Sequence, residues 1–148
     1  MDHDRMKIWH HSLYDSDTDI AGPKQISITT GAKKAHICIL IKATGSLVAT
    51  IAKTLVIGTG GGASAGTAIT PYADDQASTL TPLTVVKQDY VLGSSGQSAG
   101  TVIYSELILP YPDQEIELKL AESTAYGLVL TSIADNNAIS VDVVVREV

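Results

Sequence analysis

The fold is decided by four apolar stretches near the end of the chain: Thr101-Val-Ile-Tyr-Ser-Glu-Leu-Ile-Leu109, Gln114-Glu-Ile-Glu-Leu-Lys-Leu120, Ala125-Tyr-Gly-Leu-Val-Leu-Thr-Ser132 and Ala138-Ile-Ser-Val-Asp-Val-Val-Val145. Each stretch has the length and the Val, Ile and Leu content of a β-strand, and short segments with turn-forming residues separate them. Strands that recur every 8–12 residues or so, with turn residues between them, are typical of a β-sandwich or a β-barrel.

The same pattern continues upstream. Residues 25–29 alternate between apolar and polar side chains, as a half-buried strand does. Residues 34–43 and 47–57 flank the turn Thr44-Gly45-Ser46, and we expect them to form a hairpin. Residues 79–92 offer a further pair of strands around Pro82. In total the sequence predicts about eight strands and no helical crossover, and therefore an antiparallel β-sandwich. The strand count and the long loops favour a jelly roll.

A chain of 148 residues is long enough for one domain with a two-layer core. We assign the sandwich to residues 25–148. Residues 1–24 differ in composition, because they hold the single Trp, three of the four His and an acidic run, and we interpret them as an N-terminal arm or edge segment. The apolar side chains of Trp9, Leu13 and Tyr14 would dock this arm on its own sandwich or on a neighbouring subunit.

Composition excludes several classes of function. The formal net charge of −6 and the scattered basic residues argue against nucleic-acid binding, which needs clustered Lys and Arg. No apolar stretch approaches the roughly 20 residues of a membrane helix, and Asp2, Asp4 and Arg5 stand where a signal peptide would be apolar. We expect a soluble protein made in the cytoplasm. Cys38 is the only cysteine and is interpreted as a buried, inert thiol.

Two motifs resemble catalytic or nucleotide sites. Gly96-Gln-Ser98-Ala-Gly100 matches the pattern of a serine-hydrolase elbow, but that enzyme order needs a histidine after the serine, and His36 is the last histidine of the chain. Gly58-Thr-Gly60 follows a predicted strand, yet no phosphate-binding signature completes it. We therefore predict that the protein is not an enzyme and has no cofactor.

Two further patterns resemble metal sites. Asp15, Asp17 and Asp19 alternate as in a calcium loop, but Ile20 stands where the glycine of such a loop belongs. His3, His10 and His11 could join nearby aspartates around a metal only if the arm folded back. The favoured interpretation is a solvated acidic stretch and exposed arm histidines, with no metal.

Six blocks between residues 25 and 148 form an ordered set: Thr30-Gly-Ala-Lys-Lys-Ala-His36, Ala43-Thr-Gly45, Gly66-Thr-Ala-Ile-Thr-Pro71, Gly100-Thr-Val-Ile-Tyr-Ser105, Glu115-Ile-Glu-Leu-Lys-Leu-Ala-Glu-Ser-Thr-Ala-Tyr126 and Leu130-Thr-Ser-Ile-Ala-Asp-Asn-Asn137. In their order and spacing these blocks resemble a family of small virion proteins of tailed bacteriophages, similar to the cement or decoration proteins of phage heads. In place of the basic stretch that is common in such sequences, this chain has Tyr72-Ala-Asp-Asp75.

The resemblance implies a jelly-roll body on the outer surface of the virion capsid, where it bridges neighbouring major capsid proteins and stabilises the shell. A dimer or trimer made in the host cytoplasm would fit this role, because avidity comes from touching several subunits. We expect contacts with the capsid or with another copy on the arm and on two loops, at Trp9, Leu13, Tyr14, Gly60, Gly61, Tyr72, Asp74 and Asp75.

The alternative is a β-sandwich module on a tail or fibre that binds a host glycan or another virion protein, since fold does not fix function. Sugar sites favour exposed aromatic platforms. The chain has one Trp, six Tyr and no Phe, so this alternative has fewer aromatic residues to draw on.

Overall fold

The computed structural model describes residues 7–18, 22–53, 66–88, 101–111 and 114–148. These residues form eleven β-strands and no α-helix. Among them, no helix has the length and apolarity that crossing a membrane requires. The strands are β1 (Ile8–Thr18), β2 (Lys24–Thr29), β3 (Ala35–Ala43), β4 (Leu47–Lys53), β5 (Thr67–Ala68), β6 (Tyr72–Ala73), β7 (Val85–Gln88), β8 (Thr101–Ile108), β9 (Gln114–Leu120), β10 (Ala125–Ser132) and β11 (Asn137–Glu147).

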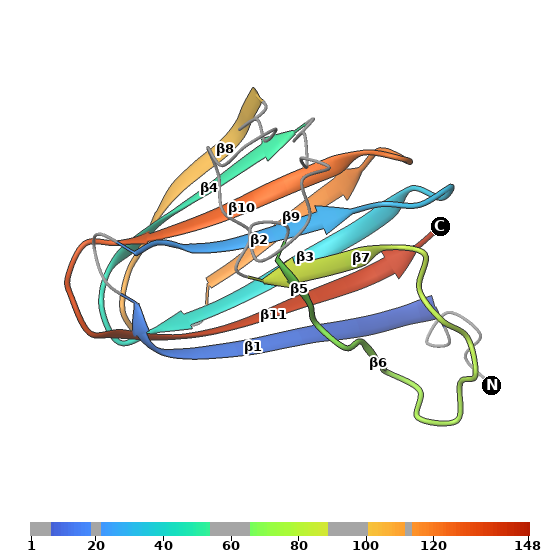
Figure 1. The fold of residues 1–148 in the computed structure, drawn as a ribbon, viewed down its shortest axis with the longest axis horizontal. Coiled ribbons are helices and arrows are strands. Elements are labelled where there is room, and N and C mark those ends of the chain that lie inside the picture. Colours follow the sequence, from blue (N-terminus) through green and yellow to red (C-terminus); the bar gives the residue numbers. More distant parts are fainter. Residues whose placement is uncertain (1–6, 19–21, 54–65, 89–100, 112–113) are drawn as a thin grey trace.

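The strands form two antiparallel sheets packed face to face, so the predicted all-β sandwich is confirmed (Figure 1). The five-stranded sheet has the order β6-β1-β11-β3-β9, and the six-stranded sheet has the order β5-β7-β2-β10-β4-β8. Eight of the eleven strands have six or more residues, and β5, β6 and β7 are shorter. The predicted number of about eight strands corresponds to these long strands.

The long strands pair in a nested order. The first pairs with the last, β1 with β11, and the next pairs inward are β2 with β10, β3 with β9 and β4 with β8. All four pairs are antiparallel, and they alternate between the two sheets from the outermost pair to the innermost. The eight long strands therefore have the pairing of one long antiparallel hairpin that is folded around the core.

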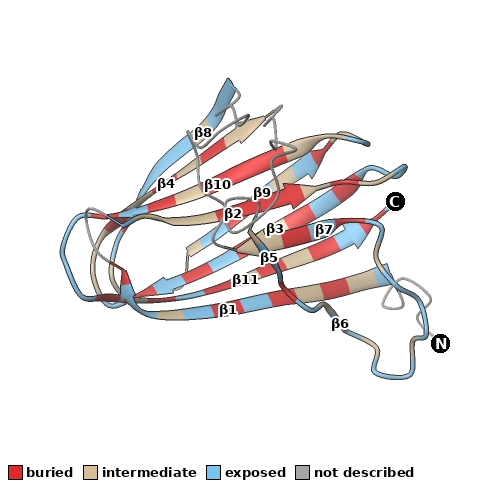
Figure 2. Ribbon diagram, in the orientation of Figure 1, coloured by how far each residue is buried: buried red, intermediate tan, exposed pale blue. Residues whose placement is uncertain are grey.

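The core lies between the two sheets, and buried residues alternate with half-buried or exposed ones along strands such as β3 and β11 (Figure 2). Along β3 the odd-numbered residues from Ala35 to Ala43 are buried, and the residues between them are exposed or half-buried. Their partners on β11 have the same parity: Ile37 faces Val145 and Ile39 faces Val143. Such a period of two fixes the register, since a slip by one residue would turn the apolar set to solvent.

The predicted hairpin of residues 34–43 and 47–57 is wrong in its pairing. The strands β3 and β4 exist, but they belong to different sheets, and residues 44–46 carry the chain from one sheet to the other. The reason is the buried side chain of Asn137 on β11. Its Oδ1 accepts a hydrogen bond from the Gly45 amide at 2.9 Å, and its Nδ2 donates to the Gly45 carbonyl at 2.9 Å. Residues 54–57 lie outside the described residues.

The segment expected to be an arm or edge segment contributes β1, which pairs with β11 from Ile8 to Thr18. Residues 79–84 contain no strand, so the strand pair predicted around Pro82 reduces, within the described residues, to β7. The two sheets are joined beside β7 by Glu147 of β11. Its buried carboxylate accepts hydrogen bonds from the backbone amides of Leu83 and Thr84, at 2.9 and 3.0 Å, and from the Thr84 hydroxyl.

Candidate functional site

Two of the segments that the sequence singled out lie next to each other. Strand β6 pairs with β1, with Tyr72 opposite His10 and Ala73 opposite Trp9. The outward side chains form a continuous surface at this end of the five-stranded sheet, which we name the β1–β6 rim. It consists of His10, Ser12 and Tyr14 from β1, Tyr72 and Asp74 from β6 and the turn after it, and Asp142 from β11.

His10 is the centre of the rim. Its Nδ1 lies 2.9 Å from Oδ2 of Asp142, and its Nε2 lies 3.2 Å from Oδ1 of Asp74. The ring of Tyr72 stacks on the imidazole, with ring centroids 5.0 Å apart and planes within 10°. Ser12 completes the network, since its hydroxyl donates to Oδ1 of Asp142 at 3.0 Å and lies 3.3 Å from the Tyr72 hydroxyl. The rim is therefore held by side chains from three separate parts of the chain.

The charges around His10 favour its protonated form. Burial alone would lower the pKa of His10, but hydrogen bonds to Asp142 and Asp74 and their negative charges outweigh burial and raise it above the ordinary value. With both ring nitrogens bonded to carboxylates, a protonated imidazole donates two charge-assisted hydrogen bonds at once. When it is protonated, His10 thus ties β1 to both β11 and the turn after β6.

The rim has a serine, a histidine and aspartates, but it lacks the geometry of a nucleophile and its base. Ser12 bonds to Asp142 and Tyr72, whereas both nitrogens of His10 face carboxylates. General-base activation requires the histidine nitrogen within hydrogen-bond reach of the hydroxyl. The arrangement therefore orders a surface and does not activate the Ser12 hydroxyl.

The eight predicted contact residues divide by their place in the fold. Tyr14 and Tyr72 are exposed, at 70% and 49%, and Asp74 lies on the rim beside them. Trp9 and Leu13 point the other way and are buried in the protein's own core, so their side chains cannot reach a partner, and this corrects their place among the contacts. Asp75 accepts a hydrogen bond from the Ala77 amide at 3.0 Å and shapes the turn after β6. Gly60 and Gly61 lie outside the described residues.

The predicted metal patterns are also changed by the fold. Adjacent strand residues face opposite sides, so His10 is on the rim while His11 is buried against β11, with Nδ1 3.3 Å from the Val143 carbonyl. Burial lowers the pKa of His11 below its ordinary value. The expectation of exposed histidines is therefore wrong for His11. Asp15 uses its carboxylate on its own segment, accepting from the Asp17 amide and the Thr18 hydroxyl, both at 3.0 Å. His3 and Asp19 are outside the described residues.

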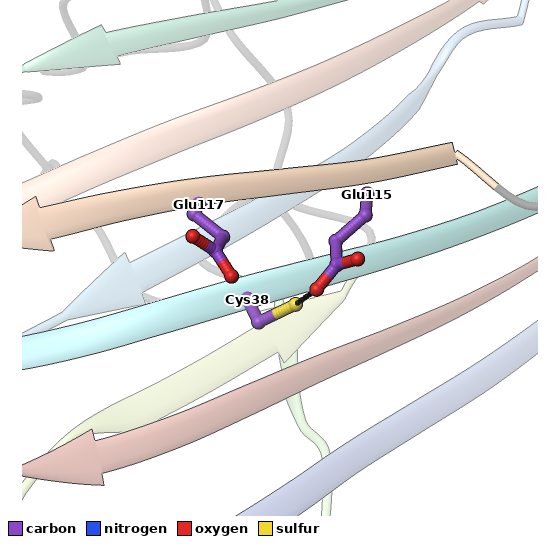
Figure 3. A group of neighbouring side chains, drawn as sticks. All are labelled: Cys38, Glu115 and Glu117. Atoms are coloured by element: carbon purple, nitrogen blue, oxygen red, sulfur yellow. Dashed lines mark hydrogen bonds between the residues drawn. The ribbon is translucent and has the colours of Figure 1, made fainter.

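A second polar group lies on the same outer face, further across the sheet. Cys38 of β3 lies beside Glu115 and Glu117 of β9 (Figure 3). The Cys38 sulfur and one carboxylate oxygen of each glutamate, the atoms that could bind a metal ion, are within 4.8 Å of one another. The thiol donates a hydrogen bond to Oε1 of Glu115 at 3.0 Å. Cys38 is half-buried and outward-facing, so the predicted burial is wrong.

The environment of Cys38 suppresses thiolate formation. Burial, the hydrogen bond to Glu115 and the charges of Glu115 and Glu117 raise the pKa of the thiol to about 12. Because the thiolate is the nucleophile, a thiol that stays protonated at neutral pH is a poor one.

An open hollow of about 440 Å³ lies between this group and β1. Its polar lining has both signs of charge, with Arg146, His36 and Lys119 beside Glu117. Across the sheet, Ile8 pairs with Arg146, Arg146 with His36, and His36 with Lys119, so these residues form one row. The hollow therefore continues the candidate surface from the rim across the five-stranded sheet.

Reasoning from the sequence missed His10 and Asp142 as partners. The two residues are 132 positions apart, and only the pairing of β1 with β11 brings them together. No local motif signals such a contact.

Comparison with known proteins adds no relative. No family model matches the chain, and neither a curated protein nor a solved structure is similar to it.

Proposed function

We propose that the protein is a structural virion protein, a capsid cement or decoration protein that binds the outside of a phage head and bridges neighbouring major capsid proteins. The observation that carries the proposal is the β1–β6 rim. Exposed Tyr14 and Tyr72 flank an ordered polar network there, and Trp9 anchors the same strand in the core. A rigid surface of this kind recognises a partner with little loss of side-chain freedom.

The strand order supports the jelly-roll form of the sandwich that we propose for this role. In a jelly roll eight strands make two sheets through two Greek keys. Taking only the eight long strands, the two sheets have the orders β1-β11-β3-β9 and β2-β10-β4-β8. Numbered one to eight along the chain, these orders are 1-8-3-6 and 2-7-4-5, which arise when a single long hairpin is rolled up.

Charge indicates the kind of partner surface. The chain carries a net charge of −6, and the rim contributes Asp74 and Asp142 around a single histidine. We therefore propose that the rim meets a neutral or basic patch on the major capsid protein. Complementary charges of this kind act on association rate and on specificity more than on affinity. An acidic protein is also better suited to the outer surface than to contact with the packaged genome.

The proposal is tested by sedimenting purified protein with expanded heads that lack decoration. We expect saturable binding at a fixed small-integer ratio to the major capsid protein. The double variant Tyr14→Ala/Tyr72→Ala should weaken binding by at least about tenfold, because large exposed aromatic side chains dominate interface energies. Ile133→Ala is the control, since Ile133 is equally exposed but lies in the turn between β10 and β11.

Two results would contradict the proposal. Absence of binding to heads would exclude the cement role. Binding that the double variant leaves unchanged would exclude the rim as the contact surface.

One observation favours a second function, a glycan-binding module of a tail or fibre. The stacked pair of His10 and Tyr72, with the carboxylates of Asp74 and Asp142 beside it, offers an aromatic face and hydrogen-bond acceptors in one place. This is the combination that sugar sites use. A glycan array separates the two functions: specific binding that Tyr72→Ala abolishes would support the module, and no signal would support the cement role.

A further inference from the structure

The four edges of the two sheets are protected unequally. Strands β5 and β6 stand at two of the edges and have only two residues each, and β6 pairs with Trp9 and His10 of β1 alone. Strand β9 closes another, and its exposed side chains are the charged residues Glu115, Glu117 and Lys119. Short edge strands and charged side chains are the usual devices that prevent edge-to-edge association. Strand β8 is longer and has one charged residue, Glu106, and its pairing with β4 contains a register shift between Ile51 and Ala52.

Strand β8 is eight residues long and has β4 as its single neighbour among the described strands. A strand with one neighbour directs half of its backbone amides and carbonyls away from the sheet. Seven of its eight residues are exposed or half-buried, and Glu106 is its one charged residue. The exposed apolar side chains of the strand and the residue after it are Val102 at 59%, Ile103 at 46%, Leu107 at 52% and Leu109 at 52%.

The sequence of β8 is compatible with pairing to itself. In an antiparallel pair that is symmetric about Ser105, Ile103 would face Leu107 of a second copy. Tyr104 would face Glu106 of that copy, and these two side chains already share a hydrogen bond within one chain. No glutamate would stand opposite a glutamate. The same operation on β9, centred on Glu117, would place glutamate directly against glutamate.

We propose that β8 is a homodimer interface, in which β8 of a second copy adds in antiparallel register and joins two six-stranded sheets into one. A second copy suits this edge because both the backbone groups and the side chains find their complements in the same sequence. The chain as a whole is acidic, so copies repel each other over most of their surface. Strand β8 carries a single charged residue, Glu106, so it adds little to that repulsion.

The dimer would explain how a bridging protein presents two contact surfaces. This explanation rests on the proposed function, whereas the pairing of β8 does not. Strand β8 and the β1–β6 rim lie at opposite edges of the molecule (Figure 1). Pairing through β8 therefore leaves both rims at the far ends of the dimer. Two linked rims bind a repeating shell more tightly than either does alone.

The test is sedimentation equilibrium of the full chain, without capsids. We expect a dimer whose dissociation constant rises on the order of 100-fold in Ile103→Lys/Leu107→Lys. The four lysines of the dimer would form two cross-strand pairs of like charge. The matched control is Leu80→Lys/Ile133→Lys, which adds the same charge at equally exposed apolar residues away from β8 and should leave the dimer intact. Both variants should keep the far-ultraviolet circular dichroism of the parent protein.

Register is tested by a cysteine at the symmetry centre. In a Cys38→Ser background, Ser105→Cys should form an intermolecular disulfide on mild oxidation, whereas Thr131→Cys, exposed on β10, should not. A parent protein that is monomeric at about 100 μM, or a dimer that the β8 lysines do not weaken, would overturn the proposal. A dimer that is weakened by the lysines but not linked through Cys at 105 would overturn the register. Because no capsid is used, these outcomes are independent of whether the protein binds heads.

Discussion

The β1–β6 rim and the β8 edge lie at opposite edges of the sandwich. They differ in how far their polar groups find hydrogen-bond partners within the chain. At the rim, β6 pairs with Trp9 and His10 of β1, and each ring nitrogen of His10 and the Ser12 hydroxyl has a partner. At β8 the described strands leave an eight-residue edge uncovered, with apolar side chains exposed. A surface whose polar side chains are already hydrogen-bonded can recognise a partner without rearranging. An unpaired strand edge gains backbone hydrogen bonds only when another strand pairs with it.

The largest effect should come from removing the rim's support inside the core. Trp9→Ala should lower the free energy of unfolding by about 3–5 kcal/mol, because Trp9 is 4% exposed and leaves a large cavity. Tyr14→Ala, on the same strand but facing out, should change it by less than about 0.5 kcal/mol. Urea unfolding of both variants measures the difference. Equal effects would mean that β1 is not packed as described.

An intermediate effect should follow from removing the carboxylate that the rim shares. Asp142→Ala leaves His10 and Ser12 each without one acceptor and should cost about 1–2 kcal/mol. At the opposite edge, Glu106→Ala removes an exposed carboxylate and should cost less than about 0.5 kcal/mol. Similar losses in the two variants would show that the rim network contributes nothing beyond an ordinary surface contact.

A smaller effect should appear in the pH dependence of stability. The folded-state pKa of His10 is raised above its unfolded value, so its contribution is fully present below the unfolded pKa, near 6.5, and is lost as pH rises through the folded pKa. Relative to His10→Gln, the parent protein should lose less than about 1 kcal/mol from pH 6 to 8, since the pair is partly exposed. His11, with its lowered pKa, has the opposite sign but is present in both proteins. Parallel stability curves would refute the role of His10.

The smallest effect is expected at the β8 edge itself. Leu107→Thr replaces a half-exposed side chain on an edge strand and should change monomer stability by less than about 0.5 kcal/mol, measured at low protein concentration. A large loss would mean that Leu107 packs within its own chain, and the contrast between the two ends would then fail.

Sequence reasoning located the strands better than their partners. The four stretches near the end of the chain coincide closely with β8 to β11, because a period of two is a local property. The predicted pairing of residues 34–43 with 47–57 is wrong, because the three-residue turn between them connects the two sheets. The side chain that makes this turn a crossover, Asn137, is 92 residues away from Gly45.

For the candidate site, the sequence likewise predicts some of the residues but not the contacts between them. Exposed Tyr14, Tyr72 and Asp74 were selected by their residue types, and the pairing of β6 with β1 brings them to one surface. Trp9 and Leu13 could not be distinguished from them, because inward and outward positions on β1 become clear only when the strand is placed in a sheet. Asp142 was missed for the same reason that Asn137 was.

The nested pairing of the strands also determines the order in which they can pair during synthesis. Because β1 pairs with β11, and His10 meets Asp142 132 residues later, β1 lacks the strand with which it makes most of its pairing until those residues have left the ribosome. At roughly 5–20 residues per second, that interval is on the order of ten seconds. During it the apolar face of β1, including Trp9, is open to other chains. We therefore expect the yield of folded protein to depend on this interval as well as on the final stability.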